Sequence, residues 1–475
     1  MNPLVLPSEE YRDAYLRITR LALHFLGTLD QQPCFPEISG DESVALFAQP
    51  LPEQGMGPAA FDMLQSVIDA SRPPSPRFFG YVLGSGEPIA AAADLLASVL
   101  NQNGTAWRSG PAAACIERLV TEWLSQAIGC QGFVGILTGG GSSANLSALA
   151  MARESRLRAN EHGIRKTVAV YASEQVHMSI PKAIALLGIG RDQLRLIPCD
   201  DNFRLRPDLL RQSIESDRRA GTTPIAIVAS AGTVATGSID PLREMASIAR
   251  EHDVWFHIDG AYGALAAIAR PQLFDGMDLA DSISLDPHKW LYQPLDCGCL
   301  LFRDRSLARR TFSFTGDYAK TLHENPVESF AFFEQSVELS RRFRALKLWL
   351  SLRYHGLANF RLQIQNDLAC ALHLASLIEA NAEIELLAPI PLSAVCFRYV
   401  PRSAPRTDAE LDELNLRILT SIQRRGRVYI SNATIRGRFA LRACIVNHRT
   451  TPADVEAVVE EVAAVGRELT SGARP

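Results

Sequence analysis

The sequence predicts an α/β protein with a mainly parallel central sheet flanked by helices. Between about residues 84 and 310, short β-rich runs alternate with helical stretches, which is typical of parallel strands joined by helices. Polar clusters follow several of these runs, at the strand end where ligands of such sheets bind. The chain has 475 residues, enough for two or three domains and a large core.

The predicted elements of this large domain alternate along the chain. The β-rich runs expected to be strands cover residues 134–137, 167–171, 225–230, 254–259, 282–285 and 298–302. The stretches expected to be helices cover residues 112–128, 143–160, 180–187, 206–220 and 241–252.

Two further segments flank the large domain, which we place at residues 84–355 with a closing helix over 340–354. Residues 1–83 predict an N-terminal helical segment, because 11–29 has apolar residues at helical spacing and prolines follow. Such a segment buries little by itself, so we expect it to pack on a partner subunit. Residues 356–475 predict a small C-terminal α+β domain. Its expected strands cover residues 394–400, 427–430 and 439–445, and a helix is expected from residue 452.

Composition narrows the function classes. The net charge is only −4 and no basic block occurs, so we expect no nucleic-acid partner. No apolar run approaches the roughly 18–20 residues that span a bilayer, and no signal peptide is expected, so we expect no membrane association. Nine cysteines without metal-binding spacing predict free thiols, no metal site and a cytoplasmic location.

One lysine stands out in the block Pro287-His288-Lys289-Trp290, which follows an apolar run. The sequence contains only five lysines, and arginine supplies nearly all the positive charge. Arginine cannot form a Schiff base, whereas lysine can. Lys289 is therefore a candidate covalent anchor for an aldehyde cofactor.

A glycine- and serine-rich segment, residues 138–145, follows a predicted strand and opens a helix. Gly141 lets backbone N–H groups approach an anion, Ser142 can add a hydroxyl donor, and a helix N-terminus favours negative charge. The segment predicts a phosphate site, although a plain tight turn explains it equally well. It is not a P-loop, because no Gly-Lys-Ser/Thr follows.

Three more clusters follow strands. Asp259 ends one strand and could hold a pyridine nitrogen protonated, with the small Ala261 admitting a flat ring; the alternative is a turn aspartate. His177 could stack on a planar cofactor, or be an ordinary surface histidine. Thr233 could donate to a phosphate or ring substituent, or close a turn. Taken together in chain order with Lys289, these residues predict a pyridoxal-phosphate site.

At this point the chain resembles the group II pyridoxal-phosphate decarboxylases of fold type I. The resemblance runs from about residue 76 to residue 447 and is carried by Pro287–Trp290, by Asp259-Gly-Ala-Tyr262 and by the segments 316–318 and 341–349. The family implies pyridoxal 5′-phosphate as cofactor, a small-molecule L-amino acid as substrate, and a homodimer whose subunits share the active site.

The resemblance also implies roles for single residues. Lys289 would form the internal aldimine, Asp259 would pair with the pyridine nitrogen, and His177 would stack on the ring. Gly141, Ser142 and His288 would lie at the phosphate. Asp286 stands where some relatives have an asparagine that contacts the cofactor.

Tyr318 separates two reactions within the family. In this family a mobile loop carries a tyrosine that protonates the substrate carbon after CO₂ leaves. Relatives with phenylalanine at that position tend to form aldehydes by oxidative deamination. Tyr318 therefore favours decarboxylation to the amine over the aldehyde-forming alternative.

The substrate side chain is less clearly indicated. Tyr81 and Arg442 are the expected substrate contacts, and Arg442 matches aromatic-acid and acidic-acid decarboxylases alike. An aromatic substrate is slightly favoured over an acidic or other polar amino acid. Two remote alternatives remain. One is a Rossmann-type oxidoreductase that uses Gly139–Gly141, but the GxGxxG spacing is lacking there. The other is a non-catalytic binding homologue.

Overall fold

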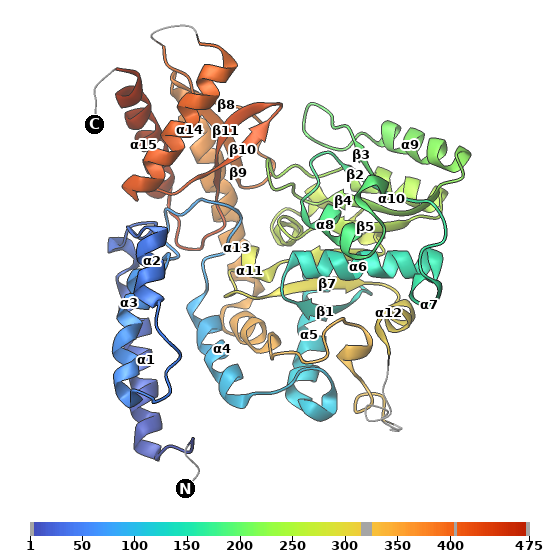
Figure 1. The fold of residues 1–475 in the computed structure, drawn as a ribbon. Coiled ribbons are helices and arrows are strands. Elements are labelled where there is room, and N and C mark those ends of the chain that lie inside the picture. Colours follow the sequence, from blue (N-terminus) through green and yellow to red (C-terminus); the bar gives the residue numbers. More distant parts are fainter. Residues whose placement is uncertain (1–3, 315–324, 403–405, 472–475) are drawn as a thin grey trace.

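The computed structural model describes residues 4–314, 325–402 and 406–471, and it confirms the predicted α/β class (Figure 1). A seven-stranded sheet has the order β1-β7-β6-β5-β4-β2-β3. Its strands are β1 Val134–Thr138, β2 Val168–Ser173, β3 Leu194–Ile197, β4 Thr223–Ser230, β5 Trp255–Asp259, β6 Ser282–Leu285 and β7 Gly298–Phe302. Neighbouring strands from β3 to β6 run parallel, and β7 is antiparallel to both β1 and β6.

The six strands predicted for this domain are all present, within one or two residues at each end. The sequence did not indicate β3. This strand has only four residues at the edge of the sheet, and its burial does not follow a clear alternation, so it carries a weak signal.

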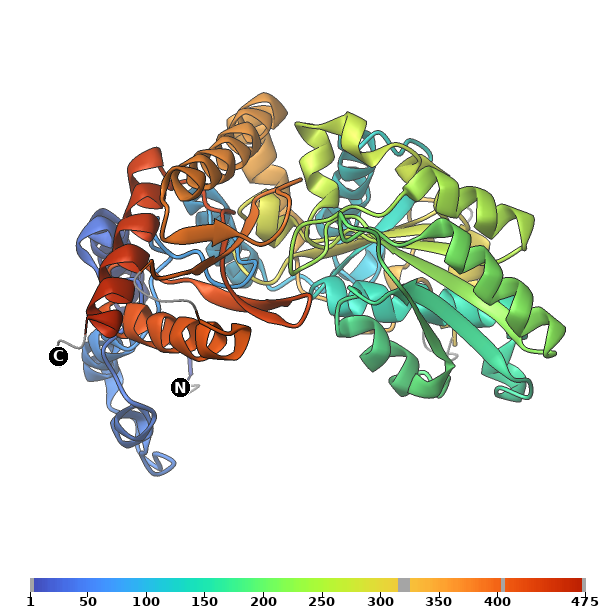
Figure 2. The same ribbon diagram turned by 90° about the horizontal axis from the view of Figure 1, so that it is seen from above.

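Helices cover both faces of the sheet (Figure 2). The helices on one face are α6 Gly141–Leu157, α8 Ser179–Leu186 and α12 Arg305–Phe312, with the short α7 Ala159–His162 after α6. Those on the other face are α5 Pro111–Ala127, α9 Pro207–Arg219 and α10 Leu242–Glu251. Alternate residues of each strand enter opposite cores: in β4, Ile227 packs in one and Val228 in the other.

The small domain has a four-stranded antiparallel sheet of order β10-β11-β9-β8 with helices α14 Asp408–Arg425 and α15 Pro452–Thr470. Its strands are β8 Ile384–Leu386, β9 Ala394–Tyr399, β10 Ser431–Ile435 and β11 Arg438–Cys444. The predicted strand over 427–430 is wrong. Tyr429 instead forms an isolated bridge with Phe78 and stacks on its ring, with centroids 4.6 Å apart, so this segment binds the chain entering the large domain.

One long helix, α13 Ala345–Ala380, joins the two sheets. The predicted helix over 340–354 was therefore placed a few residues early and ended too soon. Gly356 lies inside α13 with φ +75°, a conformation that glycine adopts without strain, and it allows the helix to kink and continue. The proposed boundary between residues 355 and 356 falls at this kink.

The N-terminal segment stands at one edge of the molecule, where α1 Ser8–Gly27 and α3 Leu64–Asp69 lie together below the small domain (Figure 1). Helix α2 Gly40–Phe47 follows α1, and α4 Pro88–Leu100 leads into the large domain. None of the residues of α1 is buried. Within the described ranges, every helix is too short or too polar to cross a membrane.

Candidate active site

A cavity of about 260 Å³ opens at the carboxyl ends of the central strands. Its wall consists of the turn after β1 and the residues that follow β2, β4, β5 and β6. The structure brings nine of the predicted site residues together on this wall: Gly141, Ser142, His177, Thr233, Asp259, Ala261, Asp286, His288 and Lys289.

Two described residues that were predicted for the site, Tyr81 and Arg442, are not on this wall. Arg442 is buried and donates from Nη1 to the Tyr81 carbonyl at 2.9 Å and from Nε to the Ala235 carbonyl at 3.1 Å. Tyr81 is 56% exposed. Their contacts with substrate stay predictions. Tyr318 lies outside the described residues.

Lys289 projects from α11 Pro287–Trp290, the short helix that follows β6. Its Nζ lies 2.8 Å from Oδ2 of Asp286, whose side chain is nearly inaccessible to solvent. The other oxygen, Oδ1, is buried and has no hydrogen-bond partner among the described residues. The amine of Lys289 is thus held at the cavity by one carboxylate oxygen.

The glycine turn forms a tight cradle beside this lysine. Gly140 has φ +142°, which favours glycine, and Gly141 begins α6. A Cβ added to Gly141 would come within 2.6 Å of the Ala261 Cβ. The N–H groups of Gly141 and Ser142 and the Ser142 hydroxyl therefore lie at a close turn where a side chain at Gly141 would clash.

His288 borders the same cradle. The Cys297 N–H donates to its Nδ1 at 3.2 Å, so a neutral ring carries its proton on Nε2, the nitrogen 3.5 Å from Oδ2 of Asp286. Desolvation by burial lowers the pKa of His288, which favours this neutral form. His288 can then donate one hydrogen bond from Nε2.

Asp259 is the last residue of β5, and hydrogen bonds to both of its oxygens fix the orientation of its carboxylate. Oδ1 accepts from the Ser284 hydroxyl at 3.1 Å and from the Ala261 N–H at 3.2 Å, and Oδ2 accepts from Asn145 Nδ2 at 2.9 Å. His177 lies nearby, with Nδ1 2.9 Å from the Ser179 hydroxyl. Burial lowers the pKa of His177 against the opposing effect of Asp259, so the neutral ring is favoured.

Three residues of the site were missed by the sequence interpretation: Asn145, Ser179 and His257. Asn145 lies one helical turn after Gly141, and His257 lies two residues before Asp259 in the same strand. Both spacings place them on the side that already carries a predicted site residue. That periodicity could have identified them, whereas the hydroxyl of Ser179 gave no such signal.

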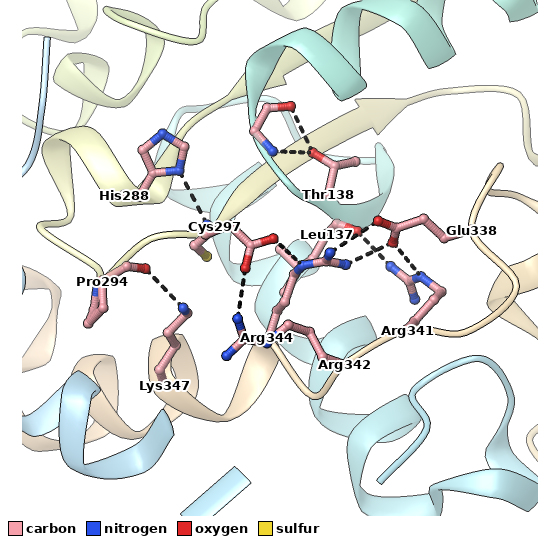
Figure 3. A network of polar contacts seen from close by, with 12 residues as sticks. Leu137, Thr138, His288, Pro294, Cys297, Glu338, Arg341, Arg342, Arg344 and Lys347 are labelled. Atoms are coloured by element: carbon pink, nitrogen blue, oxygen red, sulfur yellow. Dashed lines mark hydrogen bonds and ion pairs between the residues drawn. The ribbon is translucent and has the colours of Figure 1, made fainter. Parts of the chain in front are cut away.

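A second polar cluster, the Arg341 cluster, lies behind the loop that follows α11 (Figure 3). Its members are Arg341, Arg342, Arg344 and Lys347 with the carboxylates of Asp94, Glu117, Asp296 and Glu338. Asp296 accepts from Arg344 Nε at 2.9 Å, and the next residue, Cys297, holds His288. The cluster therefore supports the wall rather than lining the cavity.

The residues of the cavity fit pyridoxal 5′-phosphate. The cradle of Gly140 and Gly141 at the start of α6 suits a phosphate, and Ala261 leaves room for a flat ring. Lys289 offers an amine and Asp259 an oriented carboxylate on the same wall. Within the described ranges, no group of three or more His, Cys, Asp or Glu residues could hold a metal ion.

Comparison with known proteins agrees with this fit. The family model described as the pyridoxal-dependent decarboxylase conserved domain matches residues 60–400. An aromatic-L-amino-acid decarboxylase of Bacillus atrophaeus is 33% identical, covering 98% of each chain. A phenylacetaldehyde synthase of Petunia hybrida is 32% identical, covering 78% of this chain and 76% of the relative.

Solved structures resemble the whole chain. The crystal structure of Catharanthus roseus tryptophan decarboxylase in complex with L-tryptophan superposes with a TM-score of 0.89 at 27% identity. The match covers 99% of this chain and 100% of that one.

Proposed function

The chain belongs to the pyridoxal-dependent decarboxylase family, and we propose from this premise that its substrate is an aromatic L-amino acid, converted to its amine and CO₂. It is a carboxy-lyase that uses pyridoxal 5′-phosphate. The aromatic preference is supported by relatives that include aromatic-L-amino-acid, tryptophan and tyrosine decarboxylases. The observation that carries the proposed chemistry is that Lys289, Asp259 and the Gly140–Gly141 cradle line the same cavity wall.

Bound pyridoxal 5′-phosphate supplies an electron-withdrawing ring that accepts the electron pair left when the carboxylate departs. We assign Lys289 as the residue that holds the cofactor covalently through Nζ. Asp259 would keep a proton on the pyridine nitrogen; its three hydrogen bonds support this role, because they fix the carboxylate before the cofactor arrives.

Other residues of the wall bind and orient in this proposal. Ser142, Gly141 and His288 would hold the phosphate, supported by the open N-terminus of α6 and the donor at His288 Nε2. His177 would lie against the ring. Thr233 and Asp286 complete the cofactor contacts, and Asp286 keeps the Lys289 amine in the cavity.

Tyr318 is the proposed proton donor to the substrate carbon after CO₂ leaves. We expect Tyr318→Phe to divert part of the flux to aldehyde, ammonia and hydrogen peroxide, with dioxygen as the oxidant. Tyrosine and phenylalanine differ only in the hydroxyl, so this substitution tests the role of the hydroxyl proton alone. An unchanged amine yield in this variant would remove Tyr318 from the proposal.

We also propose a homodimer in which the N-terminal segment packs on the partner. No residue of helix α1 is buried, and its Leu16 and Leu23 are exposed to solvent, as are Leu96 and Val99 of α4. Apolar side chains gathered on such helices favour burial against a second copy. A solution mass near twice 52.0 kDa is expected.

The experiment that tests the function offers the holoenzyme each L-amino acid separately and quantifies amine, CO₂, aldehyde and hydrogen peroxide. We expect amine and CO₂ in equal amounts from tryptophan, tyrosine or phenylalanine. Turnover confined to glutamate, aspartate or another polar amino acid would overturn the aromatic assignment. Aldehyde with hydrogen peroxide as the main products would favour the reaction named for the Petunia relative.

A further inference from the structure

Asn145 connects the two residues proposed to contact the cofactor ring: it bonds to Asp259 directly and reaches His177 through Ser179. Its side chain, one turn into α6, is 1% exposed and has three buried partners. Nδ2 donates to Asp259 Oδ2 at 2.9 Å and to the Ser179 hydroxyl at 2.9 Å, and Oδ1 lies 2.9 Å from His257 Nε2. Every polar atom of this amide is therefore used.

The orientation of the amide follows from chemistry alone. An ionised carboxylate only accepts, so Nδ2 must face Asp259 and Oδ1 must face His257. His257 therefore donates from Nε2. His257 Nδ1 lies 2.9 Å from the Ser282 hydroxyl and 3.2 Å from the Ser282 carbonyl oxygen. Burial lowers the pKa of His257 to about 4, so near neutral pH Nδ1 carries no proton and accepts from the nearer partner, the hydroxyl.

The hydrogen bonds on the other side of His257 also run in one direction. The Trp255 indole only donates, and it does so to the Ser282 hydroxyl at 3.0 Å. The hydroxyl hydrogen of Ser282 is then left for His257. A donor-only residue and an acceptor-only residue thus fix the direction of the whole series, which we call the Asn145 network. Its members are Trp255, Ser282, His257, Asn145, Asp259, Ser179 and His177.

Ser179 extends this series of hydrogen bonds to His177 at the cavity. Its hydroxyl oxygen accepts from Asn145, so its hydrogen can be given to His177 Nδ1, 2.9 Å away. The Ser179 backbone N–H points to the same nitrogen at 3.3 Å. Two donors meet Nδ1, so the proton of neutral His177 resides on Nε2, the ring nitrogen left for the cavity.

We propose that Asn145 is a positioning residue that commits the Ser179 hydroxyl to His177 Nδ1, and thereby keeps His177 neutral with its one N–H available to the cavity. The inference rests on the proposed function, since that function supplies the partner of the N–H, an anionic oxygen of the substrate. A neutral ring also avoids placing a second positive charge beside a protonated pyridine.

The test measures the titration of His177 in the holoenzyme. Histidine labelled with ¹⁵N in the ring reports which nitrogen carries the proton, and His177→Asn identifies the His177 signals among the ten histidines. In the wild type we expect Nε2 protonated and Nδ1 bare at neutral pH. A proton on Nδ1 would overturn the inference, and this measurement requires no variant of the network to fold.

Asn145→Leu should then raise the pH midpoint of His177 by about one pH unit, the effect of one gained hydrogen bond of roughly 1.4 kcal/mol. The Ser179 hydroxyl, released from Asn145, could turn and accept from a protonated Nδ1. In Asn145→Leu with Ser179→Ala most of that rise should disappear. Asp259, Asp286 and Lys289 also face His177, but all of them remain in both proteins.

Asn415→Leu is the matched control. Asn415 is also fully buried and donates to the Tyr399 and Leu411 carbonyls, but it lies in the small domain. Its replacement should lower stability and leave the His177 midpoint unchanged. An unchanged midpoint in Asn145→Leu would overturn the inference. An enzyme that forms no amine while His177 titrates as expected would count against the proposed function alone.

Discussion

The Asn145 network and the Arg341 cluster adjoin the same cavity but are built from different groups. In the first, uncharged amide, hydroxyl, indole and imidazole groups surround one carboxylate, and the series ends at a histidine on the cavity wall. In the second, four cations pair with four carboxylates outside the cavity lining. Figure 3 shows its four cations with Glu338.

This difference separates orientation from support. A directional series of neutral groups can fix which atom carries a proton, because each hydroxyl or amide has few possible roles. Paired charges fix the position of the chain, and losing one partner leaves the other buried without compensation. Variants in the Arg341 cluster should therefore change stability, whereas variants in the Asn145 network should change proton positions and rates.

The largest expected effect is on stability, in Arg341→Met. Arg341 Nη2 lies 2.6 Å from Glu117 Oε1 and also donates to the Leu137 carbonyl at 2.6 Å, with both side chains almost fully buried. Its removal should cost about 3–5 kcal/mol, because Glu117 keeps the hydrogen bond from the Leu137 N–H but is left buried without a counter-charge. Denaturant unfolding measures this loss. Adding Glu117→Gln should recover part of it, and no recovery would show that the pair does not act as a unit.

Asp259→Asn should produce the next largest effect, on rate rather than stability. An amide cannot hold a proton on the pyridine nitrogen as a carboxylate does, so kcat should fall about 100- to 1,000-fold. Steady-state kinetics with saturating cofactor measures it. A fall of similar size in unfolding free energy, with kcat kept, would place Asp259 with the supporting residues instead.

A smaller effect is expected when His257 is removed, and it depends on pH. His257 has its pKa lowered to about 4 by burial, so the unfolded chain binds more protons between pH 6.5 and 4, and stability falls as the pH is lowered. From pH 7.5 to pH 5 this group should cost about 2 kcal/mol. His257→Gln should lose that much less than the wild type over the same range.

Comparison of the two proteins is needed here because Asp240 acts in the opposite direction. Burial raises the pKa of Asp240 to about 6, so its folded form gains stability as the pH falls. That contribution is common to both proteins and cancels in the difference. Equal losses in wild type and His257→Gln would contradict a neutral His257.

The smallest effect is expected at the surface. Arg243 pairs with Asp275 through two contacts, at 2.5 and 2.6 Å, but both side chains are more than half exposed. Exposed pairs gain little because water screens them. Arg243→Ala should leave the unfolding midpoint unchanged within error and so serves as the reference for Arg341→Met. A clear loss would show that arginine pairs stabilise this fold regardless of burial.

Much of the large domain could be predicted from the sequence because its signals are local. Strand ends carry Asp259 and the glycine turn, and the rarity of lysine draws attention to Lys289. The Asn145 network was not predictable in the same way, since the bonds of Asn145 itself reach residues 34 to 114 positions away in the chain. Arg442 illustrates the converse: a matching position in sequence does not reveal that its guanidinium is bound to the Tyr81 carbonyl.

The central claim is that Lys289 holds the cofactor, and one measurement tests it directly. Holoenzyme reduced with borohydride, digested and analysed by mass spectrometry should carry a pyridoxyl group on the peptide containing Lys289 and on none of those containing Lys166, Lys182, Lys320 or Lys347. Lys289→Ala should carry none. A pyridoxyl group on another lysine of the wild type, or one that persists in Lys289→Ala, would contradict the account.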